Sequence, residues 1–337
     1  MASVSTSNAP LVDGFNRRIT YLRLSVTDRC DLRCSYCMPE QMTFLPRKDV
    51  LSLEELHKLA LGFIDRGITK IRLTGGEPLV RRDMIELVRA IGRKLGDGLD
   101  ELTLTTNGTQ LERFAGDLYE AGVRRINVSL DTMDNRLFFE LSRRDKLVDV
   151  LRGITAAREA GLAVKLNTVA LKGLNQDEIP YLVEWAHAHG HDISLIETMP
   201  LGEVDGERIE HYLPLPIVQE ELERRWTLTP SDHATGGPSR YFDVAETGGR
   251  IGFITPLTNN FCASCNRIRV TATGQLYACL GGSEKVDLRA ALRSDNPEAE
   301  LAAALDELMR IKPERHHFRI EKGTGPAQKR HMSLTGG

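Results

Sequence analysis

Cysteine placement is the most chemically informative feature of the sequence, because all six cysteines fall into two triplets. They are Cys30, Cys34, Cys37, Cys262, Cys265 and Cys279. Three thiols in a triplet cannot all pair as disulfides within it, and a chain without an export signal is expected in a reducing compartment. Clustered thiols in such a protein indicate metal ligands or catalytic groups.

The first triplet has the spacing C-x3-C-x2-C within residues 30–37. Three thiolates can hold three irons of a [4Fe–4S] cluster, which leaves the fourth iron open to a small molecule, whereas ferredoxin clusters have four cysteine ligands. A zinc site with a fourth ligand from elsewhere is the alternative, although zinc sites usually pair C-x2-C with a second pair or with histidines. No histidine lies near this loop, since the nearest is His57. Free core thiols are a further alternative.

The second triplet has the spacing C-x2-C-x13-C within residues 262–279. Arg267 and Arg269 follow its first pair and alternate on an expected strand, so both guanidinium groups face the same side. Because arginine binds phosphate and carboxylate in a bidentate manner, the pair indicates an anionic ligand beside a metal group. Two alternatives stay open: a zinc site, because C-x2-C is a common zinc half-site, and a solvated basic strand edge.

The elements that position these residues follow from hydrophobic periodicity between residues 19 and 199. Strands are expected at 19–26, 70–75, 101–107, 125–130, 164–170 and 193–199, and helices at 52–66, 82–95, 110–121, 145–160 and 176–189. Ser52 and Glu55 form a capping-box signature at the start of the first helix. The β-α alternation predicts a parallel sheet, either open and doubly wound or curled into a partial barrel of six strands. In both folds ligands bind at the carboxyl ends of the strands.

The pattern changes after about residue 200. We expect a helix at 215–226, short strands around the second triplet at 240–280, and helices at 286–294 and 297–311. The final residues are basic and glycine-rich without periodicity. The predicted domains are an N-terminal extension (1–18), the β-α region (19–235) and a C-terminal region (236–337) that contains the second triplet.

Composition excludes several classes of protein. The 337 residues include 44 Lys and Arg against 47 Asp and Glu, a net charge of −3 that disfavours a dedicated nucleic-acid-binding protein. No apolar run approaches the ~20 residues of a membrane-spanning helix. The N-terminal segment shows no export signal, so we expect a cytoplasmic protein.

The first triplet resembles the signature of the radical S-adenosylmethionine (SAM) enzymes, with an aromatic residue, Tyr36, directly before the last cysteine. The resemblance implies an α/β fold, a partial (β/α)6 TIM-like barrel of the radical SAM type. It also implies a [4Fe–4S] cluster whose open iron binds SAM and reduces it to a 5′-deoxyadenosyl radical. The implied SAM contacts are Tyr36, Gly76 of the sequence Gly75-Gly76-Glu77-Pro78, Ser129 and Met199. Taken alone, a methionine in an apolar strand is more often plain core.

Both triplets together with a terminal Gly336-Gly337 narrow the resemblance to the GTP 3′,8-cyclase family of molybdenum cofactor biosynthesis, over about residues 12–337. This resemblance implies a second [4Fe–4S] cluster on Cys262, Cys265 and Cys279 that binds the guanine of GTP. The implied product is 3′,8-cyclo-7,8-dihydro-GTP. The implied GTP-binding residues are Arg23, Arg72, Thr105, Lys165, Arg267 and Arg269. In this family the Gly-Gly tail enters the active site. The implied partners are a synthase that makes cyclic pyranopterin monophosphate, an electron donor such as a flavodoxin, and a second copy of the chain in a homodimer.

Arg23, Arg72 and Lys165 lie within expected strands, where lone charges are costly to bury. They either line a channel with the two arginines of the second triplet, as a triphosphate would need, or pair with core carboxylates such as Asp131 or Glu197. The terminal Gly-Gly read alone is most simply a disordered end.

Other functions stay open at this point. One is a peptide- or sulfatase-modifying radical SAM enzyme, although such enzymes usually have more C-terminal cysteines. Another is a non-catalytic iron–sulfur or zinc scaffold, which would coordinate every metal fully and would not cleave SAM. His187, His189 and His191 are expected at a solvated helix end without a role.

Overall fold

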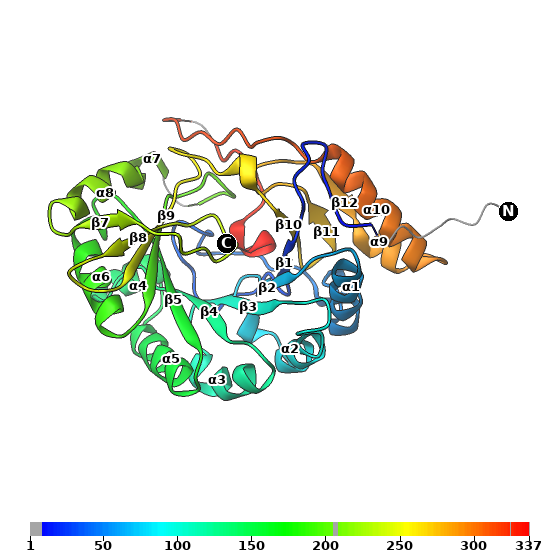
Figure 1. Ribbon diagram of the computed structural model, residues 1–337, viewed down its shortest axis with the longest axis horizontal. Helices are drawn as coiled ribbons and strands as arrows, with labels where there is room; N and C mark the ends of the chain where they lie inside the picture. Colours follow the sequence, from blue (N-terminus) through cyan, green and yellow to red (C-terminus); the bar gives the residue numbers. More distant parts are fainter. Residues whose placement is uncertain (1–8, 205–207, 324, 337) are drawn as a thin grey trace.

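The computed structural model describes residues 9–204, 208–323 and 325–336. Six strands follow one another in parallel at the centre of one sheet, which curves into a partial barrel in Figure 1. They are β1 (Tyr21–Ser25), β2 (Lys70–Thr74), β3 (Glu101–Thr106), β4 (Arg125–Ser129), β5 (Ala163–Val169) and β6 (Asp192–Ile196). The expected partial (β/α)6 barrel is confirmed, and the open doubly wound sheet is not formed.

Helices cover the outside of these strands (Figure 1). They are α1 (Leu53–Asp65), α2 (Met84–Gly92), α3 (Leu111–Glu120), α4 (Asn135–Ser142), α5 (Leu147–Glu159) and α6 (Ile179–Ala188). Short 3-10 turns are η1 (Arg47–Asp49), η2 (Pro78–Val80), η3 (Gln176–Glu178) and η4 (Cys262–Ser264). The expected helices are all present with somewhat shorter bounds, but helix α4 was not expected.

The start of α1 shows how local sequence sets these elements. Ser52 accepts a hydrogen bond from the Glu55 backbone N–H, and the Glu55 carboxylate accepts one from the Ser52 N–H. This capping box satisfies two backbone donors that would otherwise lack partners. Gly67, just after the helix, has φ 85°, a left-handed conformation that favours glycine. The predicted start and end of this helix are therefore confirmed.

The C-terminal part of the chain extends the same sheet on both sides. Strand β9 (Arg250–Ile254) pairs in parallel with β6, and β10 (Arg267–Val270) pairs in parallel with β1. Antiparallel edge strands complete the order β12-β11-β10-β1-β2-β3-β4-β5-β6-β9-β8-β7. Their bounds are β7 (Leu228–Pro230), β8 (Arg240–Val244), β11 (Gln275–Tyr277) and β12 (Lys285–Asp287). Short strands were expected here, but not their parallel addition to the barrel.

The remaining helices are α7 (Arg208–His211), α8 (Leu215–Glu223), α9 (Leu288–Leu292), α10 (Pro297–Ile311) and α11 (Met332–Thr335). Three of them match the helices predicted at 215–226, 286–294 and 297–311. Helix α11, in the tail that shows no periodicity, lies inside the ring of strands, where Figure 1 marks the C-terminus. The tail is therefore part of the barrel interior.

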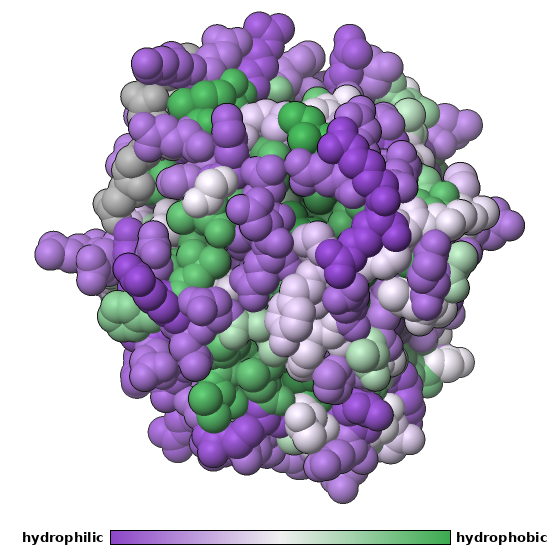
Figure 2. All heavy atoms as spheres, turned by 90° about the vertical axis from the view of Figure 1, so that its left-hand side faces the viewer, coloured by the Kyte–Doolittle hydropathy of each residue, from purple (hydrophilic) through white to green (hydrophobic). Residues whose placement is uncertain are grey.

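The core lies between the sheet and its outer helices. Strand side chains such as Leu22, Leu24, Ile71 and Leu73 are fully buried in it. The opposite faces of the same strands point into the barrel and include charged residues. The face of the molecule in Figure 2 is mainly hydrophilic with scattered apolar patches. None of the helices in the described ranges is long and apolar enough to cross a membrane.

Candidate active site

The loop after β1 holds the first cysteine triplet, and the unexpected helix α4 supports it. Arg33 and Ser35 donate backbone hydrogen bonds to the carbonyl oxygens of Ser142 (2.9 Å) and Leu141 (2.8 Å). These carbonyls end α4 and would otherwise lack an intrahelical partner. The helix and the cysteine loop therefore fix each other.

The donor set of this loop suits an iron–sulfur cluster. The three cysteines are free and partly buried, and burial raises the pKa values of Cys30 and Cys34 and raises that of Cys37 to about 11. Thiolates in such surroundings need a cation beside them. Among the described residues, no three His, Cys, Asp or Glu side chains converge on a single metal ion, as a mononuclear zinc site requires.

Tyr36 and Asp131 join the cysteine loop to the end of β4. The Tyr36 hydroxyl donates to Asp131 Oδ2 at 2.6 Å, and Val169 N donates to Oδ1 at 2.8 Å. Burial raises the pKa of Asp131 to about 6. Glu197 accepts hydrogen bonds from the backbone N–H groups of Leu215 and Leu257. Both carboxylates thus have partners other than the strand cations, contrary to the pairing considered from the sequence.

The Gly-Gly-Glu turn after β2 packs directly against the segment before Cys30. Gly76 N donates to Thr27 O at 2.9 Å, and a Cβ on Gly76 would clash with the backbone oxygen of Arg29. The buried Glu77 carboxylate accepts hydrogen bonds from Asn107 N (2.6 Å) and Thr106 Oγ1 (2.8 Å). Burial raises the pKa of Glu77 to about 7. The turn therefore ties the ends of β1, β2 and β3 together and requires glycine where it meets the loop.

A cavity of about 120 Å³ lies inside the barrel and brings together nine of the residues that the sequence singled out, but none of Cys30, Cys34 and Cys37. Its lining includes Arg23, Arg72, Lys165, Met199, Cys262, Cys265, Arg267, Arg269 and Cys279. Thr105 does not line this cavity but accepts a hydrogen bond from Arg72 Nη1 at 3.1 Å. Ser129, the last residue of β4, is half-buried and also lies outside the lining. The expected cationic channel beside the second triplet is therefore present.

Strand register explains why the cations meet. Arg23 of β1 lies opposite Arg269 of β10 and opposite Arg72 of β2. Arg23 Nε and Nη2 are buried without a hydrogen-bond partner. Burial and the neighbouring Arg269 lower the pKa of Arg23, and burial and Arg267 lower that of Arg269 to about 10. Among the described residues no carboxylate pairs with this buried row of like charges, which makes it a site for an anion.

Tyr21 belongs to a second row on the same face, between Arg267 and Lys70. Burial alone would raise the pKa of the Tyr21 hydroxyl, but the surrounding cations lower it to about 7, and Arg72 has the largest effect among them. Arg72 Nε donates to this hydroxyl at 2.5 Å. The tyrosine thus orients an arginine of the cavity.

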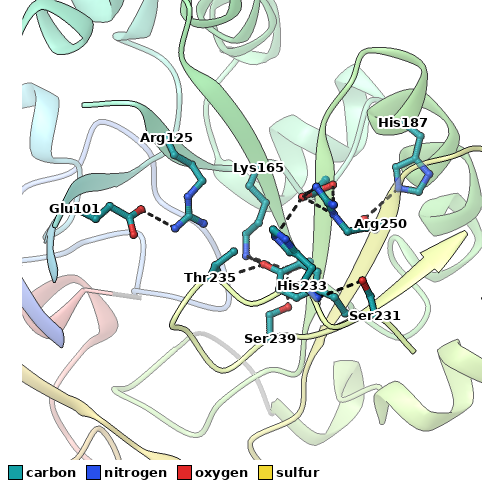
Figure 3. A network of polar contacts seen from close by, with 12 residues as sticks. Glu101, Arg125, Lys165, His187, Ser231, His233, Thr235, Ser239 and Arg250 are labelled. Carbon is teal, nitrogen blue, oxygen red and sulfur yellow. Dashed lines mark hydrogen bonds and ion pairs between the residues drawn. The ribbon is translucent and has the colours of Figure 1, made fainter. Parts of the chain in front are cut away.

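An outer chamber of about 600 Å³ opens at the amino ends of the strands and shares Tyr21, Lys165 and Thr235 with the inner cavity. In Figure 3, Glu101, Arg125 and Lys165 from neighbouring strands face this space, with Thr235 of the loop 231–239 across it. Glu101 pairs with Lys70 (2.7 Å) and with Arg125 (2.6 Å). These ion pairs were missed, although a charged residue at the first position of three consecutive strands was a usable signal.

Lys165 joins the two spaces. Its Nζ donates to Ser194 Oγ and to Tyr241 Oη, both at 3.0 Å (Figure 3). Burial lowers the pKa of this lysine. His187 contacts Thr247 Oγ1 at 2.6 Å and the carbonyl oxygen of Arg250 at 3.2 Å, and Figure 3 shows the second of these contacts. His187 and His191 are 9% and 4% exposed, so the expected solvated histidine cluster is wrong for these two residues.

Residues far apart in the sequence hold the second cysteine loop. Arg17 Nη1 donates to Cys262 O at 2.7 Å, and Lys312 Nζ donates to Arg267 O (3.1 Å) and Ala278 O (2.6 Å). Burial alone would raise the pKa of Cys265, but Arg267 and Lys312 lower it to about 7. Sequence analysis missed Arg17 and Lys312, because their contacts depend on tertiary packing.

The C-terminal tail enters the same interior. Arg269 Nη1 donates to Gly336 O at 3.1 Å, and Arg330 Nη2 donates to Cys279 O at 3.2 Å. Gly336 has φ 72°, and a Cβ there would clash with the Thr74 side chain. Gly202 N donates to Gln328 O at 2.8 Å. Gly336 is thus placed in the barrel and not in a disordered end, and Gly337 lies outside the described residues.

Comparisons with known proteins identify the family of this chain. Residues 24–186 match the radical SAM superfamily, and residues 191–318 match the family described as Molybdenum Cofactor Synthesis C. A GTP 3′,8-cyclase of Erythrobacter litoralis (strain HTCC2594) is 70% identical over 97% of this chain and 98% of the relative. The chain belongs to the GTP 3′,8-cyclase family. A second relative of that name, from Rhizobium etli (strain CIAT 652), is 58% identical over 97% of this chain and 94% of its own.

As a GTP 3′,8-cyclase, the protein is a radical SAM lyase that acts in molybdenum cofactor biosynthesis. Membership implies GTP as substrate, and SAM with a [4Fe–4S] cluster as cofactors. The relatives favour GTP cyclisation over the peptide-modifying enzyme and over the scaffold considered from the sequence.

Solved structures share the fold. Streptococcus suis SuiB bound to S-adenosylmethionine aligns with TM-score 0.62 and 17% identity, over 87% of this chain and 68% of SuiB. Native anSMEcpe with bound AdoMet aligns with TM-score 0.56 and 15% identity, over 84% and 83%. At this identity the likeness concerns the radical SAM fold of the GTP 3′,8-cyclase alone.

Proposed function

We propose that this GTP 3′,8-cyclase uses the two cysteine triplets at opposite sides of one cationic barrel interior, with SAM at the first and GTP at the second. Cys30, Cys34 and Cys37 would hold the first [4Fe–4S] cluster. When bound, this cluster and SAM supply one-electron cleavage of SAM to a 5′-deoxyadenosyl radical, which takes hydrogen from the GTP ribose. The residues described below bind, orient and seclude the reactants.

Four residues are assigned to SAM in this proposal: Tyr36, Gly76, Ser129 and Met199. In this assignment the Gly76 carbonyl oxygen would accept from the methionyl amine of SAM, because its N–H already donates to Thr27 O. Tyr36 is fixed by Asp131, so its backbone position next to Cys37 is constrained. Met199 lines the inner cavity.

The second triplet, Cys262, Cys265 and Cys279, is proposed to hold a second [4Fe–4S] cluster that binds the guanine of GTP. Support comes from the donor set: three free thiols face the same cavity as the arginines, and no described carboxylate or histidine converges with them on one ion. Arg17 and Lys312 hold the backbone of this loop through three carbonyl oxygens. A preformed loop reduces the ordering that metal binding would otherwise require.

The triphosphate is assigned to Arg23, Arg72, Lys165, Arg267 and Arg269, with Thr105 orienting Arg72. The observation that carries this assignment is the pair of buried Arg23 N–H groups without any acceptor. Phosphate oxygens would supply those acceptors in charge-assisted hydrogen bonds. The outer chamber is less suited to a triphosphate, because its cations Lys70 and Arg125 are already paired with Glu101. The inner cavity is therefore the proposed phosphate site.

Gly336 and Gly337 are proposed as catalytic residues that support SAM cleavage. The contact between Arg269 and the Gly336 carbonyl, together with the absence of room for a side chain beside Thr74, supports this role. The same arginine would then touch both the tail and the substrate phosphates. GTP binding and tail position are coupled in this proposal.

The wider setting is also proposed. The protein would be cytoplasmic, receive electrons from a donor such as a flavodoxin, and pass its product to the synthase of cyclic pyranopterin monophosphate. A second copy of the chain, in a homodimer, is a further proposed partner. The proposed division of the chain remains 1–18, 19–235 and 236–337, with the last two regions sharing one sheet.

The test is anaerobic and uses the full chain reconstituted with iron and sulfide. Dithionite and SAM are added, and 5′-deoxyadenosine is quantified with GTP, with ATP and without nucleotide. We expect GTP-dependent formation of 5′-deoxyadenosine together with loss of GTP to the cyclised product. In Cys262→Ser the second cluster should be lost and the first should remain, so iron content and the electron paramagnetic resonance signal distinguish the two clusters. SAM cleavage indifferent to GTP would contradict the phosphate and guanine assignments.

A further inference from the structure

We propose that the surface formed by the first cysteine loop and helix α4 is the docking site of an acidic protein that delivers single electrons. The inference rests on the electron donor of the proposed function and adds the surface that receives it. This α4 surface comprises Arg29, Arg33, Arg136, Phe139, Arg143, Arg144 and Lys146.

Direct contact between α4 and the loop brings this surface close to the first cluster site. The two backbone hydrogen bonds from Arg33 and Ser35 to the last carbonyls of α4 bracket Cys34. Arg143 Nη1 also lies 3.4 Å from Met38 O, just after Cys37. Because electron transfer slows steeply with distance, a donor bound on α4 would be well placed for the cysteine loop.

Charge makes this surface selective for an acidic partner. Residues 29–48 and 136–146 together contain eight basic and four acidic residues, whereas the whole chain has a net charge of −3. One of those acids, Asp31, accepts hydrogen bonds from Asn107 Nδ2 (2.7 Å) and Thr109 Oγ1 (2.6 Å), and Lys146 pairs with Asp149 at 2.8 Å. A local positive field on an overall negative protein steers an acidic partner to one place.

Aromatic residues give the surface the chemistry of a protein interface. Phe139 is 56% exposed, although Phe138 and Leu141 of the same helix already supply its buried face. Arg136 lies three residues before Phe139 in α4, so these two side chains share one side of the helix. On the loop, the guanidinium groups of Arg29 and Arg33 lie 5.6 and 4.8 Å from the centre of the Phe44 ring. Exposed aromatic and arginine side chains are enriched at protein interfaces.

Arg33 and Arg143 must stay unchanged in a test, because they also hold the loop. Arg33 Nη1 donates to Cys30 O at 2.6 Å, and Arg143 Nη1 donates to Met38 O at 3.4 Å. Arg136 and Arg144 are the residues to change. Arg136 is exposed, and among the described residues the Arg144 guanidinium donates only to the neighbouring Arg143 O.

The experiment compares two reductants on the reconstituted full-length protein. Initial rates of 5′-deoxyadenosine formation are measured with GTP and SAM, first with dithionite and then with increasing concentrations of a purified flavodoxin reduced by its reductase. For Arg136→Glu/Arg144→Glu we expect at least a tenfold rise in the flavodoxin concentration that gives half-maximal rate. With dithionite, which needs no docking surface, the rate should stay within twofold of the wild-type rate. The flavodoxin-dependent rate of the wild type should fall with added NaCl.

A matched control is Arg113→Glu/Arg224→Glu, which reverses two exposed charges on α3 and after α8. It should leave both rates unchanged. Phe139→Ala removes the aromatic centre without changing charge, and it should raise the half-maximal flavodoxin concentration about threefold. If the double charge reversal misfolds, Arg136→Gln/Arg144→Gln is used in its place, and we expect a smaller rise in the half-maximal flavodoxin concentration.

An unchanged flavodoxin dependence in the α4 variants, or an equal change in the control, would overturn the docking site. A parallel loss with dithionite would also overturn it, since it would show that the arginines serve the cluster loop itself. By contrast, a wild-type protein that makes no 5′-deoxyadenosine with dithionite would refute the proposed function and not the docking surface.

Discussion

Arg23 and Arg269 lie opposite each other on the parallel strands β1 and β10, both less than 10% exposed. Arg269 has an acceptor in Gly336 O, whereas two N–H groups of Arg23 have none. This pairing of like charges costs stability in the protein without its nucleotide, because burial without a counter-charge is unfavourable. The barrel interior is therefore prepared for an anion that touches both arginines.

Arg23→Met tests whether the barrel interior is built to bind an anion. Without nucleotide, we expect the variant to be more stable by about 1–3 kcal/mol, because unpartnered buried N–H groups are removed. With GTP, loss of charge-assisted hydrogen bonds worth about 1.5–3 kcal/mol should raise KM roughly 10- to 100-fold. Thermal unfolding and steady-state kinetics check the two effects, with the exposed Arg18→Met as control. Unchanged KM together with unchanged stability would contradict an anion site at Arg23.

Gly336→Ala tests the tail. The added Cβ would clash with the Thr74 side chain in a left-handed conformation, so we expect at least a tenfold loss of 5′-deoxyadenosine formation with both clusters retained. Gly323→Ala is the matched control, because Gly323 has the same φ of 72° and nothing near its Cβ position. Equal losses in the two variants would attribute the effect to backbone strain alone.

Much of this architecture could be predicted from the sequence, because the six β-α units have strong local periodicity and explicit helix signals such as Ser52 and Gly67. Helix α4 was missed because it has only eight residues and lies directly before the longer α5. The parallel pairing of β9 and β10 was missed for a different reason. Strands of four or five residues show no preference for a partner, and their place depends on contacts across the whole chain.

The residues of the site also fall into those that the sequence predicted and those that it did not. The cysteines and the strand cations were found because thiol spacing and charges in apolar strands are visible without a structure. Arg17 and Lys312 act through backbone carbonyls that only the tertiary fold brings near them. His191 was assigned to a solvated helix end, yet the turn after α6 folds back and leaves it 4% exposed.

His191 makes stability depend on pH. Burial and the nearby Arg158 lower its pKa to about 4, whereas the ordinary value is 6.5. The unfolded chain therefore binds the proton first as pH falls, and the stability contributed by neutral His191 is complete above pH 6.5 and is lost between pH 6.5 and about 4. Urea unfolding of His191→Gln at pH 7.5, 6 and 5 should show a shallower decline than the wild type. The exposed His317→Gln should behave as the wild type does, and an identical slope for both variants would refute the assignment.

Arg17 links the N-terminal segment to the second cysteine loop, which gives a prediction about cluster content. Its guanidinium pairs with Asp13 at 2.7 Å and donates to the carbonyls of Cys262, Pro313 and Glu314. In Arg17→Ala those carbonyl oxygens lose their hydrogen-bond donor. Among the described hydrogen bonds, the one from Arg17 to Cys262 O is the only bond between the second cysteine loop and residues 9–18. We therefore expect the bound iron to fall toward half of the wild-type value with the first cluster retained, while GTP-dependent 5′-deoxyadenosine formation and GTP cyclisation are lost.

The neighbouring Arg18→Ala, which removes an exposed charge, should keep full iron and both activities. Arg17→Lys can still reach one carbonyl, so it should give an intermediate iron content. Loss of iron from both clusters in Arg17→Ala would indicate general unfolding, which circular dichroism would report. Full iron content in this variant would mean that Cys262, Cys265 and Cys279 hold their geometry without the N-terminal segment.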